Sequence, residues 1–146
     1  RCRAFGLDLP VLTHEPKFAD AVKQASGAGA NVVLDLVGGN YFPESLNSLA
    51  VKGRLIIVGL TAGRKSEFDL GMALSKRAHI TGTVLRGRST EEKAAAIQQF
   101  VVEVVPLLER GAVRPNLDRV FPVAEIQEAH RYLESNESFG KVVLRF

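Results

Sequence analysis

The hydrophobic pattern of this chain is dominated by two short, almost continuously apolar runs. They span Val32–Val37 and Leu55–Val58, and each is followed by glycine. Runs of this length are typical of strands that are buried on both faces of a parallel sheet. The segment between them places apolar residues on one helical face: Phe42, Leu46, Leu49 and Ala50. The pattern therefore predicts a strand–helix–strand unit with two parallel strands.

Amphipathic and turn patterns place further elements on both sides of this unit. A short strand is expected at Leu9–Thr13 and a helix at Lys17–Ser26. After the unit, a short helix is expected around Leu70–Ser75 and a strand at Ile80–Leu85. Glycine-rich segments separate these elements, as turns require.

The last third of the chain opens with a helix signal. Ser89 and Glu92 have the spacing of a capping box, and the long apolar-striped helix behind them is expected to kink at Pro106. Three more elements follow, which are a strand at Arg119–Val123, an amphipathic segment at Ala124–Asn136 and a strand at Lys141–Phe146. Pro122 cannot donate a ladder hydrogen bond, so the first of these strands is expected at an edge, outside the main sheet.

Two consecutive strands that end in glycine indicate a ligand-binding edge. The carboxyl ends of parallel strands meet at one edge, where dinucleotides bind in many α/β proteins. Gly38, Gly39 and Gly59 carry no Cβ and allow a ligand to approach the main chain, although a tight turn alone would also explain them. Asp35 ends the first run, and its carboxylate is expected to cap nearby loop amides. The sequence thus predicts part of a dinucleotide-binding domain.

Composition and charge narrow the classes of function. The 146 residues carry a net charge of +3, and their basic side chains are scattered with few aromatic residues among them. A nucleic-acid interface needs a basic patch with interleaved aromatics, so we expect no nucleic-acid partner. No apolar run approaches the roughly 20 residues that cross a bilayer, so we expect no membrane partner. With Cys2 as its one cysteine and no apolar leader segment, the chain is expected to be cytoplasmic.

The residues most often used in catalysis form no recognisable group. His14, His79 and His130 are dispersed, and no helix carries a glutamate–histidine metal motif, so no metal site is predicted. His130 falls on an apolar helix stripe and is expected to be a core or interface residue. No serine stands in a nucleophile elbow. We therefore assign no catalytic acid, base or nucleophile.

Five motifs occur in an order and spacing that resemble one known family. They are LDLVGG, GRLIIVGL, KRAHITGTVLRGR, FPVAEIQEAHRYLES and FGKVVLRF. Together they resemble the second half of the zinc-independent quinone oxidoreductases of the medium-chain dehydrogenase/reductase superfamily. The resemblance implies an α/β fold: a partial Rossmann-like parallel sheet with flanking helices, plus a carboxyl-terminal helix and strands that would pack on an absent catalytic domain. It also implies an incomplete nucleotide-binding domain at 1–118 and a segment at 119–146 that returns to the catalytic domain.

The implied function is that of the carboxyl-terminal part of an NADP(H)-dependent oxidoreductase that reduces a quinone or an enone. NADP(H) follows from the family alone, because residues that select a 2′-phosphate would precede Arg1. The resemblance further implies a homodimer through the exposed edge of the strand at 80–85. The isolated chain is expected to be inactive, since no G-x-G-x-x-G links a strand to a helix. That absence leaves an alternative open: a non-catalytic Rossmann-like association module without dinucleotide binding.

The resemblance assigns cofactor contacts to the strand ends and the turns that follow them. These residues are Val37, Gly38, Gly39, Val58, Gly59, Leu60, Thr61, Leu85, Arg86, Gly140 and Lys141. An ordinary structural role stays open for several of them: a tight turn at the glycines, a solvated side chain at Arg86 and a strand start at Gly140.

Overall fold

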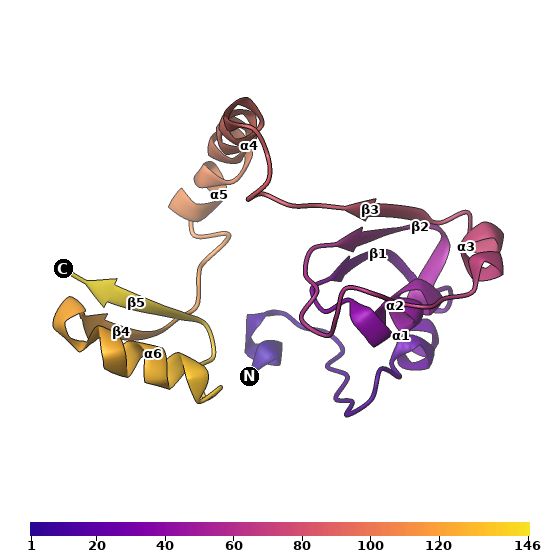
Figure 1. The fold of residues 1–146 in the computed structure, drawn as a ribbon, viewed down its shortest axis with the longest axis horizontal. Coiled ribbons are helices and arrows are strands. Elements are labelled where there is room, and N and C mark those ends of the chain that lie inside the picture. The colour runs from indigo at the N-terminus through magenta and orange to yellow at the C-terminus, as the bar shows by residue number, and fades with distance from the viewer. The chain divides into compact units, whose positions relative to one another are not determined.

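The computed structural model describes residues 1–146 and divides into two compact units, Arg1–Gly87 and Arg88–Phe146 (Figure 1). The predicted fold class is confirmed, since parallel sheets with flanking helices make up both units. The division between the units lies before the boundary predicted at 118/119. That boundary concerns roles in a longer enzyme, and it stays a prediction.

The first unit is built around a three-stranded sheet in the order β1-β2-β3. These strands span Ala30–Asp35, Leu49–Ile57 and His79–Gly82. Both neighbouring pairs run parallel, which confirms the predicted strand–helix–strand unit. The carboxyl ends of all three strands consequently meet at one edge of the sheet.

Three helices accompany this sheet, and Figure 1 shows α1 and α2 on one of its faces. The helices are α1 (Ala19–Ser26), α2 (Phe42–Ser48) and α3 (Leu70–Lys76). The core is the buried cluster Phe42, Leu46, Leu49 and Leu55. Met72 of α3 and Ile57 of β2 pack against this cluster. The apolar stripe read from the sequence therefore fixes the face that α2 buries.

The opposite face of the sheet is exposed within this unit, so the expectation of strands buried on both faces is wrong here. Side chains alternate along β1: Val33 packs against the core cluster, whereas Leu34 is 63% exposed. An apolar run predicts a strand, but it does not show whether both faces of that strand are buried, because the elements that would cover them lie elsewhere in the sequence.

Two strand predictions fail because ladder partners are missing. Leu9–Thr13 forms no strand, since no strand lies beside it to share main-chain hydrogen bonds. The strand predicted to continue to Leu85 ends at Gly82, because its neighbour β2 ends at Ile57. Beyond Gly82, the amide of Thr83 still donates to the carbonyl oxygen of Ile57, at 2.9 Å.

The boundary between α2 and β2 also differs from the prediction. Leu49 and Ala50 begin the strand instead of ending the helix, and Leu49 pairs with Ala30. Within β2, Lys52 has φ 62° and the register shifts. The apolar stripe thus carried the predicted helix past its end, because Leu49 and Ala50 belong to the strand that pairs with β1.

The second unit begins with the predicted capping box. The Ser89 amide donates to a Glu92 carboxylate oxygen at 3.0 Å, and the Glu92 amide donates to Ser89 Oγ at 3.2 Å. Helix α4 spans Thr90–Glu103 and α5 spans Val105–Glu109. The expected kink at Pro106 is a full break between two helices, because proline cannot donate within the helix and is tolerated in its first turn.

The remainder of this unit is a separate two-stranded parallel sheet with one helix. Strands β4 (Leu117–Pro122) and β5 (Lys141–Arg145) pair, and α6 (Ile126–Glu134) connects them. The prediction of a strand outside the main sheet is confirmed. His130 is exposed on α6 while its neighbour Ala129 is buried, so His130 is not a core residue, and its expected interface role stays a prediction.

Among residues 1–146, none of the helices combines the length and the apolar character needed to cross a membrane.

Candidate functional site

The candidate site lies at the carboxyl edge of the three-stranded sheet, where two turns run side by side. We call Leu36–Gly39, after β1, the first turn and Val58–Gly63, after β2, the second turn. The Val58 amide donates to the Asp35 carbonyl oxygen at 2.7 Å, and the Ala62 amide donates to the Val37 carbonyl oxygen at 2.8 Å. Because β1 and β2 are parallel neighbours, the two turns form one continuous main-chain surface.

Asp35 holds the first turn in place, as the sequence predicts. Its side chain is only 4% exposed, and Oδ1 accepts hydrogen bonds from the amides of Val37 at 2.9 Å and Gly38 at 2.8 Å. Oδ2 is buried and has no hydrogen-bond partner. A buried acceptor left unpaired opposes folding by about 1–3 kcal/mol. The carboxylate therefore orders the turn at a cost to stability.

The glycines of the turns are required by the contact between the turns themselves. A Cβ at Gly59 would lie 2.3 Å from the Leu36 carbonyl oxygen, and one at Gly39 would lie 2.3 Å from the Ala62 carbonyl oxygen. Gly38 and Gly39 also have positive φ, at 66° and 54°. The turn interpretation of these glycines is thus correct, and it is compatible with a ligand lying over the same main chain.

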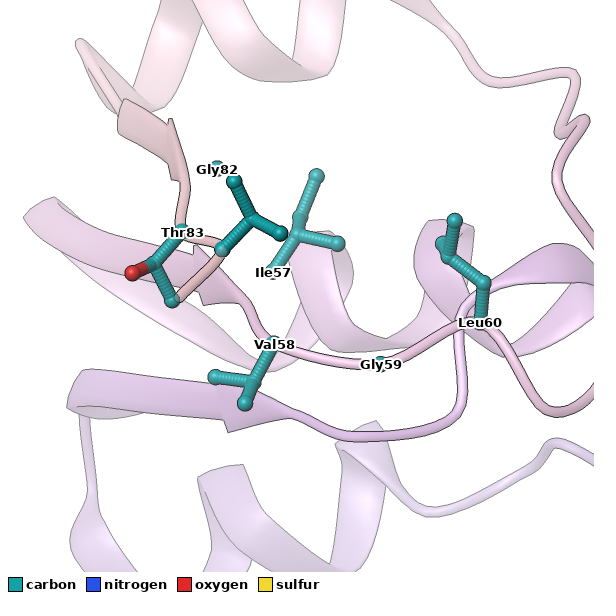
Figure 2. A pocket seen from close by; sticks show the side chains of 7 residues that line it. Ile57, Val58, Gly59, Leu60, Gly82 and Thr83 are labelled. Atoms are coloured by element: carbon teal, nitrogen blue, oxygen red, sulfur yellow. The ribbon is translucent and has the colours of Figure 1, made fainter. Parts of the chain in front are cut away.

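A depression of about 580 Å³ lies at this edge (Figure 2). Its lining residues are Ile57, Val58, Gly59, Leu60, Gly82, Thr83 and Val84. In Figure 2 the side chains of Ile57 and Leu60 rise on one side of the chain, Val58 points to the other, and Gly59 leaves a gap between them. No lining residue is titratable, so this surface is suited to holding an apolar ring and excluding water rather than to proton transfer.

Two smaller cavities open beside it. One of about 190 Å³ is lined by Gly38, Gly39, Phe42, Ile57, Leu60, Arg64, Ser66 and Phe68. Another of about 230 Å³ lies at the end of β1 and is lined by Phe18, Val33, Leu34, Asp35, Leu36, Val37, Tyr41 and Ser45. Residues of the first turn therefore border both of these cavities.

The structure brings together most of the residues predicted from the first two strands. Val58, Gly59 and Leu60 line the depression of about 580 Å³, and the first-turn residues Val37, Gly38 and Gly39 line the smaller cavities. Thr61, Leu85 and Arg86 line none of these three hollows, although Thr61 lies within the second turn. Their predicted contacts stay predictions.

Gly140 and Lys141 belong to the second unit, so their predicted approach to a cofactor also stays a prediction. The structure gives Gly140 a local role, because its φ is 128° and a Cβ there would lie 2.5 Å from the Asn116 carbonyl oxygen. The Lys141 amide donates to that same oxygen at 2.8 Å. The strand-start interpretation therefore accounts for both residues.

Sequence reasoning expected the end of the third strand to contribute Leu85 and Arg86, and it missed the three residues at the end of β3 that line the depression. Gly82, Thr83 and Val84 line it, whereas the sequence pattern placed the end of that strand at Leu85. Gly82 was the available signal, since glycine within an apolar run often marks the end of a strand.

The site contains no set of side chains that would bind a metal. No group of three or more histidine, cysteine, aspartate and glutamate residues could hold an ion within residues 1–146. The groups available to a ligand at this edge are main-chain atoms, apolar side chains and the glycines of the two turns.

A comparison with known families decides the ancestry of this fold. The model of the zinc-binding dehydrogenases matches residues 5–144. The chain belongs to the zinc-binding dehydrogenase family. Its predicted membership of the medium-chain dehydrogenase/reductase superfamily is thereby confirmed.

Several relatives are named as quinone oxidoreductases or quinone oxidoreductase-like proteins. Quinone oxidoreductase-like protein 2 of Mus musculus is 30% identical over 140 residues, which are 95% of this chain and 40% of that protein. A mycobacterial quinone oxidoreductase superimposes with a TM-score of 0.77 and 25% identity, over 96% of this chain and 43% of that one. A mycobacterial protein in complex with NADPH gives a TM-score of 0.73 and 26% identity, over 97% and 45%. This zinc-binding dehydrogenase chain thus spans less than half the length of each.

Proposed function

We propose that this chain supplies one side of the cofactor site of an NADP(H)-dependent quinone or enone oxidoreductase. The observation that carries the proposal is the pair of glycine turns beside an apolar depression at the carboxyl edge of a parallel sheet. This is the edge at which dinucleotides bind in such folds. The names of the mouse relative and the mycobacterial NADPH complex support the choice of reaction and cofactor.

The residues present fit the nicotinamide end of such a cofactor. The depression is apolar, and an added Cβ at Gly82 would meet no atom within 4 Å, so a flat ring has room beside the strand end. Val58 and Leu60 would exclude water from the ring, and Gly59 would let it approach the main chain. NADPH itself would supply the hydride when bound, so this chain's part is to bind and orient. In keeping with the family resemblance, the proposed reaction needs no zinc.

The diphosphate end is not provided for in these residues. No glycine-rich turn links a strand to a helix in the required pattern, and two amides of the first turn are already bonded to Asp35. We therefore propose that residues 1–118 are an incomplete nucleotide-binding domain and that residues 119–146 return to a catalytic domain. Thr61, Leu85, Arg86, Gly140 and Lys141 would complete the contacts in the whole enzyme, a cytoplasmic homodimer.

The absence of a glycine-rich strand-to-helix turn in these residues also favours one alternative, a non-catalytic association module. The two proposals differ in whether the full-length protein binds and oxidises NADPH. If the enzyme proposal holds, the full-length protein oxidises NADPH with a simple quinone, while the 146-residue chain alone binds NADPH weakly and shows no turnover. Binding of NADPH to the isolated chain at micromolar concentration would contradict the incomplete-site proposal. Absence of NADPH binding by the full-length protein would favour the association module.

A substitution pair locates the nicotinamide in this test. Gly82→Leu places a side chain in the depression, whereas Gly87→Leu adds one at a glycine that lines none of the hollows and whose added Cβ would meet only Val84 Cγ1, at 4.0 Å. In the full-length protein we expect Gly82→Leu to weaken NADPH binding at least tenfold and Gly87→Leu to leave it unchanged. Equal affinities of the two variants would remove the depression from the proposed site.

A further inference from the structure

Asp35 stands at the junction of the two turns and contacts both. Its side chain accepts the amides of Val37 and Gly38 in the first turn. Its main-chain carbonyl oxygen accepts the amides of Val58 at 2.7 Å and Gly59 at 3.2 Å in the second. One residue thus receives four hydrogen bonds, two from each turn.

The peptide group between Val37 and Gly38 links the Asp35 side chain to the second turn. The amide of Gly38 donates to Asp35 Oδ1, and the carbonyl oxygen of the same peptide group, on Val37, accepts from the Ala62 amide at 2.8 Å. Because a peptide group is planar and trans, its N–H and C=O point in opposite directions and rotate together. The carboxylate therefore sets the direction in which the Val37 carbonyl meets the second turn.

Asp35 is buried, so capping the turn with its carboxylate costs desolvation energy that an exposed cap would not. The side chain is nine-tenths buried or more, and Oδ2 has neither a donor nor water access. An ionised carboxylate is a stronger acceptor of amide hydrogen bonds than a neutral group, which is the compensation for burying its charge. This carboxylate therefore provides strong hydrogen bonds to the amides of Val37 and Gly38.

We propose that Asp35 is a positioning residue that fixes the two glycine turns relative to each other, and so fixes the main-chain surface offered to the dinucleotide. The dinucleotide part rests on the function proposed above. The coupling of the turns does not, and it is measurable in the 146-residue chain alone.

Amide hydrogen exchange in the isolated chain tests the coupling. With Asp35→Ala we expect exchange at Gly38 to rise roughly tenfold, since a hydrogen bond to a charged group is worth about a factor of ten. Exchange at Ala62, which never touches the side chain, should rise by a similar factor. The matched control is Asp69→Ala, which removes a carboxylate that accepts the Gly71 amide at 2.7 Å and should raise exchange only there.

The outcomes separate positioning from simple capping. Faster exchange at Val37 and Gly38 with no change at Ala62 would overturn the proposal, because the carboxylate would then act on the first turn alone. If Asp35→Ala speeds exchange throughout the β1–β2 ladder, the sheet itself is opening and Asp35→Asn becomes the deciding variant. It retains a neutral acceptor, so we expect roughly threefold faster exchange at Gly38 and Ala62 with the ladder unchanged. An unchanged Ala62 would again overturn the proposal.

Kinetics of the full-length enzyme test the consequence for the cofactor. Asp35→Asn should raise the KM for NADPH several-fold and leave kcat unchanged, while Asp69→Asn changes neither. If NADPH binds the native enzyme and Asp35→Asn binds it equally well, the positioning role fails. If exchange behaves as expected but the native enzyme binds no NADPH, the proposed function fails and the coupling stands.

Discussion

Gly59 and Gly82 look alike in the sequence, and the structure predicts opposite effects when each is replaced by alanine. A Cβ at Gly59 would lie 2.3 Å from the Leu36 carbonyl oxygen, whereas ordinary contact begins near 3.4 Å. The Leu36 carbonyl would have to move by about 1 Å. Its flanking peptide groups are held by Asp35, so we expect Gly59→Ala to lower the free energy of unfolding by about 2 kcal/mol, as overpacking does.

Gly82→Ala should act in the other direction. The added Cβ meets no atom within 4 Å, and the glycine has no positive φ. At such a position alanine restricts the unfolded chain and raises the free energy of unfolding by about 0.4–1 kcal/mol. The two variants should therefore differ by about 2.5 kcal/mol, which corresponds to about 1–2 M in the urea midpoint for a small unit.

Tyrosine fluorescence measures this difference in the first unit alone. The chain has two tyrosines and no tryptophan. In a Tyr132→Phe background, Tyr41 is the single reporter, and it lies in the first unit. Urea midpoints that coincide for Gly59→Ala and Gly82→Ala, or a more stable Gly59→Ala, would refute the close-approach argument. The comparison also shows why a large residue at Gly59 tests folding and binding together, whereas one at Gly82 tests binding.

Three further predictions concern other parts of the chain. Amides alternate in direction along a strand, and the Thr83 amide donates to β2, so the amide of Ile80 points away from β2 at the exposed edge of β3. Ile80→Pro removes this donor and should convert the proposed homodimer to a monomer, as measured by light scattering. A monomeric native protein would contradict the dimer. The Tyr132 hydroxyl donates to an Asp118 carboxylate oxygen at 2.7 Å, and this hydrogen bond raises the pKa of Tyr132 above its usual value of 10. The bond therefore contributes to the free energy of unfolding below pH 10, and this contribution is lost as the pH rises through the raised pKa. Absorbance titration should show that raised pKa, with Asp118→Asn lowering it and an unchanged titration contradicting the bond. Leu46→Ala empties a fully buried core position and should lower the free energy of unfolding by about 2–5 kcal/mol in urea denaturation, whereas a loss under 1 kcal/mol would mean that the core refills.

The sequence by itself determined the order of the elements and the edge at which the site lies. Apolar runs ending in glycine marked β1 and β2, and the stripe from Phe42 to Leu46 marked the buried face of α2. These signals are local, because the sequence pattern of a strand, a cap or a helix face lies within a short segment of the chain. The capping box at Ser89 and Glu92 is present for the same reason.

Only the tertiary structure decided which strands had partners and why each glycine was needed. Leu9–Thr13 has strand-like residues but no neighbour, and β3 ends at Gly82 because β2 ends first. Likewise, nothing near Gly59 in the sequence reveals that the Leu36 carbonyl oxygen lies where its Cβ would be. Pairing and close approach join residues that are distant along the chain, and a local pattern carries no record of the distance between them.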